Sequence, residues 1–205
     1  MYVAICVLLS VPLLAFGQGA HLDAPWLTVY DVAGRPRWEV ELEELTRDDE
    51  GWHGQDAHIT LYHEGEPQAV LLASQLVTDA LGREWNLREG VEGVWGILKV
   101  QAERAHWDGD LTMWEVDAQA EDMTLTAAQA HWSPGAPLEL SEVWAVVQGW
   151  ELSFATGNYE VEAEVLFAQD VDLRGHGLEI GAVELRVSAR GGEVTLTDAQ
   201  LVPID

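Results

Sequence analysis

From residue 25 onward, apolar and polar side chains alternate along the chain with a period of two. Trp38, Val40 and Leu42 alternate with glutamates 39, 41 and 43, as on a β-strand with one buried and one solvent-exposed face. A helix would spread these glutamates around its whole circumference. The alternation therefore predicts strands over Leu27–Val32, Trp38–Leu42, Ala57–Tyr62, Val70–Thr78, Gly96–Ala105, Leu111–Ala118, Met123–Trp132, Leu138–Val147, Trp150–Thr156, Tyr159–Phe167, Gly177–Ala189 and Glu193–Leu201.

Turn-forming residues separate these segments. Gly, Pro, Asn and Asp cluster between them, at Ala33–Pro36, Glu64–Pro67, Leu81–Gly82, Asp108–Asp110, Ser133–Gly135, Gly157–Asn158 and Gly191–Gly192. Within Leu178–Leu185 the apolar phase slips by one residue at Gly181, which predicts a β-bulge. We find no amphipathic helical pattern after the N-terminal segment, so the fold class is all-β.

The strands repeat one another weakly. Ala-His-Trp occurs at 105–107 and again at 130–132, and each copy continues through a turn into a second strand. Leu152–Tyr159 and the segment from Leu72 onward are further, weaker copies. A strand–turn–strand unit that recurs every 25 to 28 residues exposes an apolar face that its neighbours must cover. This predicts an elongated β-jellyroll or a solenoid-like sandwich, built from repeated antiparallel strand pairs.

The N-terminal segment differs from the rest of the chain. Residues 3–16 are apolar and uncharged, and as a helix they would reach about 21 Å, short of the hydrocarbon core of about 30 Å. Small residues at Ala15 and Gly17 are compatible with cleavage before Gln18, although no Lys or Arg precedes the segment. We therefore expect residues 1–20 to be a signal peptide or a short membrane anchor, and residues 21–205 to form one domain outside the cytoplasm.

Composition excludes several functions. The chain has 36 Asp and Glu against 10 Lys and Arg, a formal net charge of -26, which argues against nucleic acid as a partner. A basic patch for anionic lipid headgroups is equally disfavoured, so a lipid would be held mainly by its apolar part. Cys6 is the one cysteine, so neither an intramolecular disulfide nor a cysteine-based metal site can form.

Leu27–Gly34 followed by Trp38–Leu42 has the form "D-x-x-G-x-x-x-W", and Leu125–Trp132 has the form L-x-A-x-x-A-x-Y/W. With this opening and these strand pairs, the sequence resembles, over roughly residues 26–168, the periplasmic lipopolysaccharide-transport proteins of the LptC/LptA (OstA-like) group. The resemblance implies an open, V-shaped β-jellyroll that shields acyl chains and docks edge to edge with related domains. It also implies lipopolysaccharide or another envelope lipid as cargo, an inner-membrane ABC transporter as a partner, and a periplasmic or membrane-anchored location.

A lipid-binding trough would need apolar side chains that remain accessible to a ligand. The alternation directs one set inward: Trp38, Val40, Leu42, Val100, Trp114, Val116, Leu125, Leu152, Phe154, Val161 and Val165. The alternative is a closed core without ligand, which would make the protein a structural or interaction domain of the envelope. Free sheet edges for partner binding are expected on the strands that contain Leu27, Val29, Val194 and Leu196.

Chemistry-bearing motifs are scarce. His53, His58 and His63 are spaced by five, which in a strand places successive histidines on opposite faces. The glutamates of 39–43 and 160–164 lie too far apart along one strand to share a calcium ion. No nucleophile elbow, phosphate-binding glycine loop or His-Glu-x-x-His motif occurs. We therefore expect no enzyme, no cofactor and no metal, with a polysaccharide-acting enzyme as the remote alternative.

Overall fold

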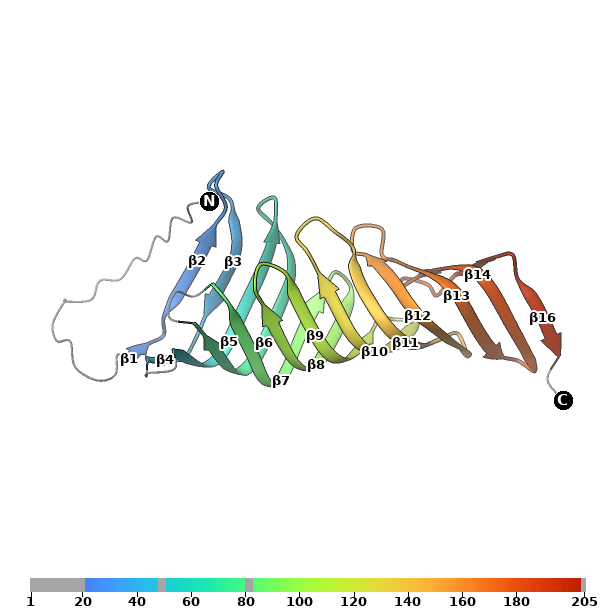
Figure 1. The fold of residues 1–205 in the computed structure, drawn as a ribbon, viewed down its shortest axis with the longest axis horizontal. Coiled ribbons are helices and arrows are strands. Elements are labelled where there is room, and N and C mark those ends of the chain that lie inside the picture. Colours follow the sequence, from blue (N-terminus) through green and yellow to red (C-terminus); the bar gives the residue numbers. More distant parts are fainter. Residues whose placement is uncertain (1–20, 48–50, 80–82, 204–205) are drawn as a thin grey trace.

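The computed structural model describes residues 21–47, 51–79 and 83–203, which form one long antiparallel sheet. Figure 1 shows its strands side by side along one axis, with β1 and β16 at opposite ends. Neighbours in sequence pair with one another, apart from the split strands near the two ends. This confirms the predicted all-β jellyroll of repeated strand pairs. The strands are β1 His21–Asp23, β2 Trp26–Tyr30, β3 Pro36–Glu41, β4 Glu44–Arg47, β5 Trp52–His63, β6 Glu66–Thr78, β7 Trp85–Trp95, β8 Leu98–Trp107, β9 Leu111–Gln119, β10 Met123–Trp132, β11 Leu138–Val147, β12 Trp150–Glu160, β13 Val165–Gly175, β14 Leu178–Ser188, β15 Val194–Thr197 and β16 Gln200–Pro203.

A single line of backbone kinks, which we call the crease, crosses the sheet from end to end. On every second strand it is formed by a left-handed residue with φ between 46° and 61°, at Ala24, Asp56, Glu89, Glu115, Glu142, Asp170 and Asp198. The pairing register aligns these with residues of ordinary φ on the strands between them, at Glu43, Ser74, Glu103, Ala128, Ala155 and Val183. At the ends the crease interrupts the ladder, which splits one crossing strand into β1 and β2, one into β3 and β4, and one into β15 and β16.

The crease reverses which side chains face inward. In β9, Leu111 and Met113 are buried before the crease, whereas Val116 and Ala118 are buried after it. The sheet therefore folds into two walls whose apolar faces oppose each other. Wall I comprises the strand halves that end at the turns of Gly34, Gly65, Gly96, Gly149 and Gly177 and at the turn 120–122. Wall II comprises the strand halves that end at Thr78 and Trp85 and at the turns 108–110, 133–137, 161–164 and 189–193.

Opposite the crease, turns of the two walls meet along a seam. A Cβ on Gly135 of wall II would lie 2.7 Å from His63 Cε1 of wall I, and one on Gly96 of wall I would lie 2.9 Å from Val161 Cγ1 of wall II. Gln148 Nε2 donates to the Gly191 carbonyl at 3.0 Å. In the described part of the chain no strand pairing joins the two rims, so side chains and turn backbone alone close the seam.

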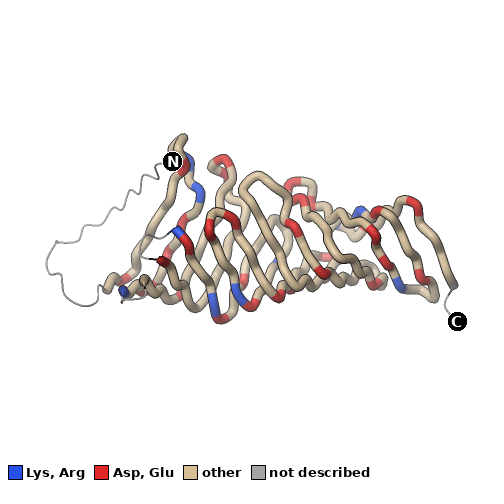
Figure 2. The backbone as a smooth tube through the Cα atoms, in the orientation of Figure 1, with Lys and Arg blue, Asp and Glu red and all other residues tan. Residues whose placement is uncertain are grey.

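The outer face of wall II is unusually poor in acidic residues. Two rows of outward side chains run across β5 to β15, and among them only Glu139 and Glu184 are acidic. Figure 2 shows Asp and Glu along the whole molecule. We call these two rows the outer rows of wall II: Gln55, Gln75, Arg88, Arg104, Trp114, Gln129, Ser141, Thr156, Gln169, Glu184 and Thr197 next to the crease, then His53, Val77, Asn86, His106, Thr112, His131, Glu139, Asn158, Phe167, Arg186 and Thr195.

Three sequence-based predictions fail. Gly157–Asn158 is not a turn, because both residues lie within β12 and pair with β11 and β13. Tyr159–Phe167 is not one strand, because β12 ends at Glu160 and residues 161–164 form the turn into β13. The phase slip in Leu178–Leu185 is real but lies at the crease, at Val183–Glu184, and β14 pairs with β13 without a shift of register. There is accordingly no bulge at Gly181.

The predicted N-terminal signal or anchor, residues 1–20, lies outside the described residues. Within 21–47, 51–79 and 83–203 there is no helix of the length and apolar character needed to cross a membrane.

Candidate lipid-binding interior

Between the two walls lies one continuous apolar cluster, and five tryptophans form its centre. Trp38 of β3 meets Trp85 of β7 edge to face, with ring centroids 6.3 Å apart, and Trp85 stacks on Trp107 of β8 at 5.7 Å. Trp107 in turn contacts Trp132 of β10 at 6.4 Å, and Trp132 packs edge to face against Trp95 at 5.2 Å. Aromatic pairs in these geometries are favourable beyond the area that they bury, so the rings tie wall I to wall II.

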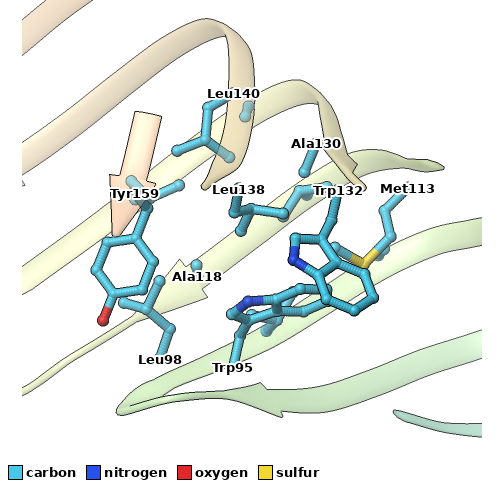
Figure 3. Packing of buried hydrophobic residues seen from close by; sticks show 14 of the residues in the cluster. Trp95, Leu98, Met113, Ala118, Ala130, Trp132, Leu138, Leu140 and Tyr159 are labelled. Atoms are coloured by element: carbon cyan, nitrogen blue, oxygen red, sulfur yellow. The ribbon is translucent and has the colours of Figure 1, made fainter. Parts of the chain in front are cut away.

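Small residues make room for these rings. Ala105 and Ala130 are at most 1% exposed and each lies two residues before a tryptophan of the cluster. Figure 3 shows Ala130 beside Trp132, with Trp95 below and Leu98 and Tyr159 nearby. The repeated Ala-His-Trp motif therefore supplies, in both copies, an inward alanine and an inward tryptophan on either side of an outward histidine.

The structure places eight of the eleven predicted lining residues in the apolar cluster. Each is less than a tenth exposed, and they come from β3, β8, β9, β10, β12 and the residue after β3: Trp38, Val40, Leu42, Val100, Val116, Leu125, Leu152 and Phe154. Val165 of β13 is also buried, but it lies outside the cluster, and the next residue, Leu166, faces inward instead. The interior is thus apolar as predicted, and it is closed in this structure by the turns along the seam.

Trp114 and Val161 are corrections to the predicted set. Trp114 and Val116 are two residues apart and would lie on the same face of a regular strand. The crease at Glu115 lies between them and turns Trp114 outward. There Arg104 covers its ring, with Cζ 4.5 Å from the ring centroid. Val161 is half-buried in the turn after β12, against Gly96 at the seam. It is therefore part of the closure and not of a strand.

Three polar atoms inside have no hydrogen-bond partner among the described residues. They are the indole Nε1 atoms of Trp85 and Trp95 and the hydroxyl of Tyr159. Burial raises the pKa of Tyr159 to about 12, so this hydroxyl is neutral at physiological pH. A buried polar group without a partner is costly, which makes these atoms natural contact points for the polar part of an amphiphile.

The strands predicted to bind partners lie at the ends of the sheet, and their binding of partners stays a prediction. Leu27 and Val29 lie on β2, which pairs with β3 alone, and Val194 and Leu196 lie on β15, which pairs with β14 alone. Trp26 beside the first edge is 58% exposed, and Leu201 beside the second is 61% exposed. Both ends therefore present apolar side chains to solvent.

The histidines do not converge. The crease at Asp56 lies between His53 and His58, so both point outward from different walls, and the expected opposite-face arrangement of this pair is wrong. His63 lies at the seam against Gly135. Within the described residues no group of three or more His, Cys, Asp or Glu side chains is placed to hold a metal ion.

Sequence reasoning missed Trp85, Trp95, Trp107, Trp132 and Tyr159, which are all buried. The inward-facing positions shift by one residue in the middle of each repeat, and this shift would have revealed them. In Leu125–Trp132, for example, Leu125 and Ala127 are inward before the crease and Ala130 and Trp132 after it.

No family model matches this sequence, and no curated protein matches it. Among solved structures, the chain is similar to one described as the crystal structure of LptH, the LptA homologous periplasmic component of the conserved lipopolysaccharide transport device from Pseudomonas aeruginosa. The identity is 12% and the TM-score 0.42, over 53% of this chain and 95% of that chain.

Proposed function

We propose that this protein carries the acyl chains of lipopolysaccharide or a related envelope lipid between its two walls, outside the cytoplasm. The observation that supports this most is the construction of the interior: a continuous apolar cluster lies between walls that the backbone joins only at the crease. Acyl chains would enter where the turns part and pack beside the inward residues. The protein would bind and release the lipid without a chemical step.

The seam is a suitable entrance because few interactions hold it. Gly96 against Val161, Gly135 against His63 and Gln148 bound to Gly191 are contacts between turns, with no ladder of backbone hydrogen bonds between them. Such turns open locally at low free energy compared with the sheet itself. Lipid would replace protein contacts among the tryptophans, and its polar groups would meet Trp95 Nε1 and the Tyr159 hydroxyl.

The two unpaired edges of the sheet would join the protein to neighbouring domains, along which the lipid would pass. We propose that β2 at one end and β15 at the other pair with related β-jellyroll domains, one of them belonging to an inner-membrane ABC transporter complex, by strand addition. A photo-crosslinking amino acid in place of Trp26 is then expected to capture such a domain in intact cells. The same amino acid in place of Trp144, which is exposed in the middle of wall I, should not.

Lipid entry is tested by locking the seam. In the full chain with Cys6→Ser, the pair Gly96→Cys and Val161→Cys places two thiols across the Gly96–Val161 contact, where a disulfide can form. We expect the reduced protein to take up cis-parinaric acid saturably, with quenching of tryptophan fluorescence. Oxidation should weaken uptake at least about tenfold, and reduction should restore it.

The main alternative is an envelope domain without ligand. The near-complete burial of the predicted lining residues favours it, because they already pack against one another. Absence of saturable uptake by the reduced protein, together with absence of copurified lipid by mass spectrometry, would establish this alternative. Uptake that oxidation leaves unchanged would instead show that the ligand does not enter at the seam.

A further inference from the structure

The outer face of wall II, on the opposite side of the sheet from the apolar interior, carries a hollow of its own. It measures about 630 Å³ and extends across β11 to β15, within the range typical of small-ligand sites. Its lining includes Glu139, Asn158, Phe167, Gln169, Glu184 and Arg186, with threonines beside them. The hollow therefore combines hydroxyls, two amides, two carboxylates, an aromatic ring and a guanidinium.

Side chains, and not free backbone groups, can recognise a ligand over most of the hollow. The backbone of β12, β13 and β14 is paired on both sides, whereas β15, at one margin of the hollow, pairs with β14 alone. An extended peptide could therefore add a strand only at that margin. Amide and hydroxyl side chains both donate and accept hydrogen bonds, as is required to bind a ligand that is covered with hydroxyl groups.

Phe167 and Arg186 form the one flat, partly apolar surface in the hollow. The Arg186 guanidinium lies over the Phe167 ring, with Cζ 5.5 Å from the centroid. The same arrangement recurs at Trp114, which Arg104 covers at 4.5 Å. Trp114 is four strands away in the adjoining outer row, about 19 Å at a strand spacing of about 4.8 Å.

The outer rows of wall II differ from the rest of the chain in charge. The protein has a formal charge of -26, yet the outer rows of wall II hold three arginines against Glu139 and Glu184. The hollow itself is lined by Glu139 and Glu184 together with one arginine, Arg186. This charge suits a neutral ligand, whereas a polyanion such as nucleic acid would be repelled by the field of the whole molecule.

We propose that the outer rows of wall II bind a glycan of several sugar units, which packs against the Phe167–Arg186 and Trp114–Arg104 pairs and hydrogen-bonds to the amides and hydroxyls between them. The glycan is either free or the headgroup of a lipid, since the chemistry at this face is the same. This site does not depend on lipid entry at the seam, because it lies on the outside of the sheet.

A glycan array probed with the full chain, followed by calorimetric titration with the tightest glycan, tests the proposal. We expect Phe167→Ala to weaken binding by about tenfold, and Asn158→Ala, at an exposed position that cannot affect the core, by a smaller factor. Ser153→Ala, equally exposed but on wall I, is the matched control and should bind as the parent does.

The source of the glycan is resolved by titrating the same sugar with and without its lipid anchor. Equal affinities, or tighter binding of the anchored form that Phe167→Ala still weakens, both support a glycan site on wall II. The proposal is wrong if no glycan on the array binds, or if Phe167→Ala and Asn158→Ala leave the affinity unchanged in chains that fold normally.

Discussion

At the scale of single residues, the interior combines close packing with a few uncompensated polar atoms. Tyr159 is fully buried and its hydroxyl has no hydrogen-bond partner among the described residues. Gly96 and Val161, which form part of the seam, lie directly beside it. The environment of the Tyr159 hydroxyl therefore depends on whether the seam is closed or open. If the two turns part, the hydroxyl gains access to water or to a ligand.

Tyr159→Phe should change the response of stability to alkaline pH. The pKa of Tyr159 is raised to about 12 by burial, above the value of about 10 in an unfolded chain. The folded state then holds the proton more tightly, so stability falls as pH rises from about 10 to about 12, by up to about 2–3 kcal/mol. Removing the hydroxyl should reduce this decline and cost little at pH 7. Part of the decline should remain, because burial also raises the pKa of Tyr62.

Urea unfolding at several pH values measures the effect. Tyr30→Phe, at a tyrosine that is 36% exposed, is the control and should leave the alkaline decline in place. A parallel decline in Tyr159→Phe and in the parent protein would mean that this hydroxyl is already solvated in the folded state.

At the scale of elements, the crease converts a flat ladder into two opposed walls. It does so with left-handed residues that are mostly Asp and Glu and not glycine. A non-glycine residue in this conformation costs on the order of 1 kcal/mol, and the cost recurs on every second strand. The packing of both walls around the tryptophan cluster must offset it.

Glu142→Gly should therefore stabilise the protein, by about 1 kcal/mol, because glycine adopts the observed φ of 52° without strain. Glu142→Ala removes the same charge but keeps the strain, and should therefore stabilise less than Glu142→Gly does. Ala128→Gly, at a crease position with ordinary φ, should destabilise by about 0.5–1 kcal/mol. Urea midpoints that shift in the same direction for both glycine variants would contradict this account of the crease.

The crease also explains how far the sequence could predict the fold. Alternation identified most strands and the apolar set that begins at Trp38, because period two holds within each wall. It failed at Trp114, where the inward-facing positions shift by one residue at the crease, and across 159–167, where a turn interrupts the strand. The change of alternation within a repeat marks the crease, as in Leu125–Trp132, but its left-handed glutamates carry no signature of their own, unlike glycine, asparagine or aspartate. The seam depends on contacts between distant turns, which no local pattern predicts. The outer rows of wall II depend on the register of many strands and were equally invisible.

At the scale of the whole molecule, charge opposes the compact fold. Eight of the thirteen crease residues are acidic, and Glu43 lies beside Asp56 on the neighbouring strand. The pKa of Glu43 is raised, first by its hydrogen bond with the Asp56 carboxyl and then by the charge of that group. The folded state therefore holds this proton more tightly than the unfolded state, and the stabilisation it gives is lost as pH rises through the raised pKa.

Salt should therefore stabilise the protein. Screening shortens the reach of each charge to about 10 Å at 0.1 M and about 3 Å at 1 M, which weakens repulsion along the crease and between turns. We expect Tm to rise by about 3–6 °C between about 0.01 M and about 0.5 M NaCl, or about 1–2 kcal/mol for a chain of this size. The triple variant Glu103→Gln, Glu115→Gln, Glu142→Gln should begin from a higher Tm and gain less from salt. Equal gains for the parent and the variant would place the repulsion elsewhere, and a Tm that does not respond to NaCl would show that the charges are already too far apart to interact.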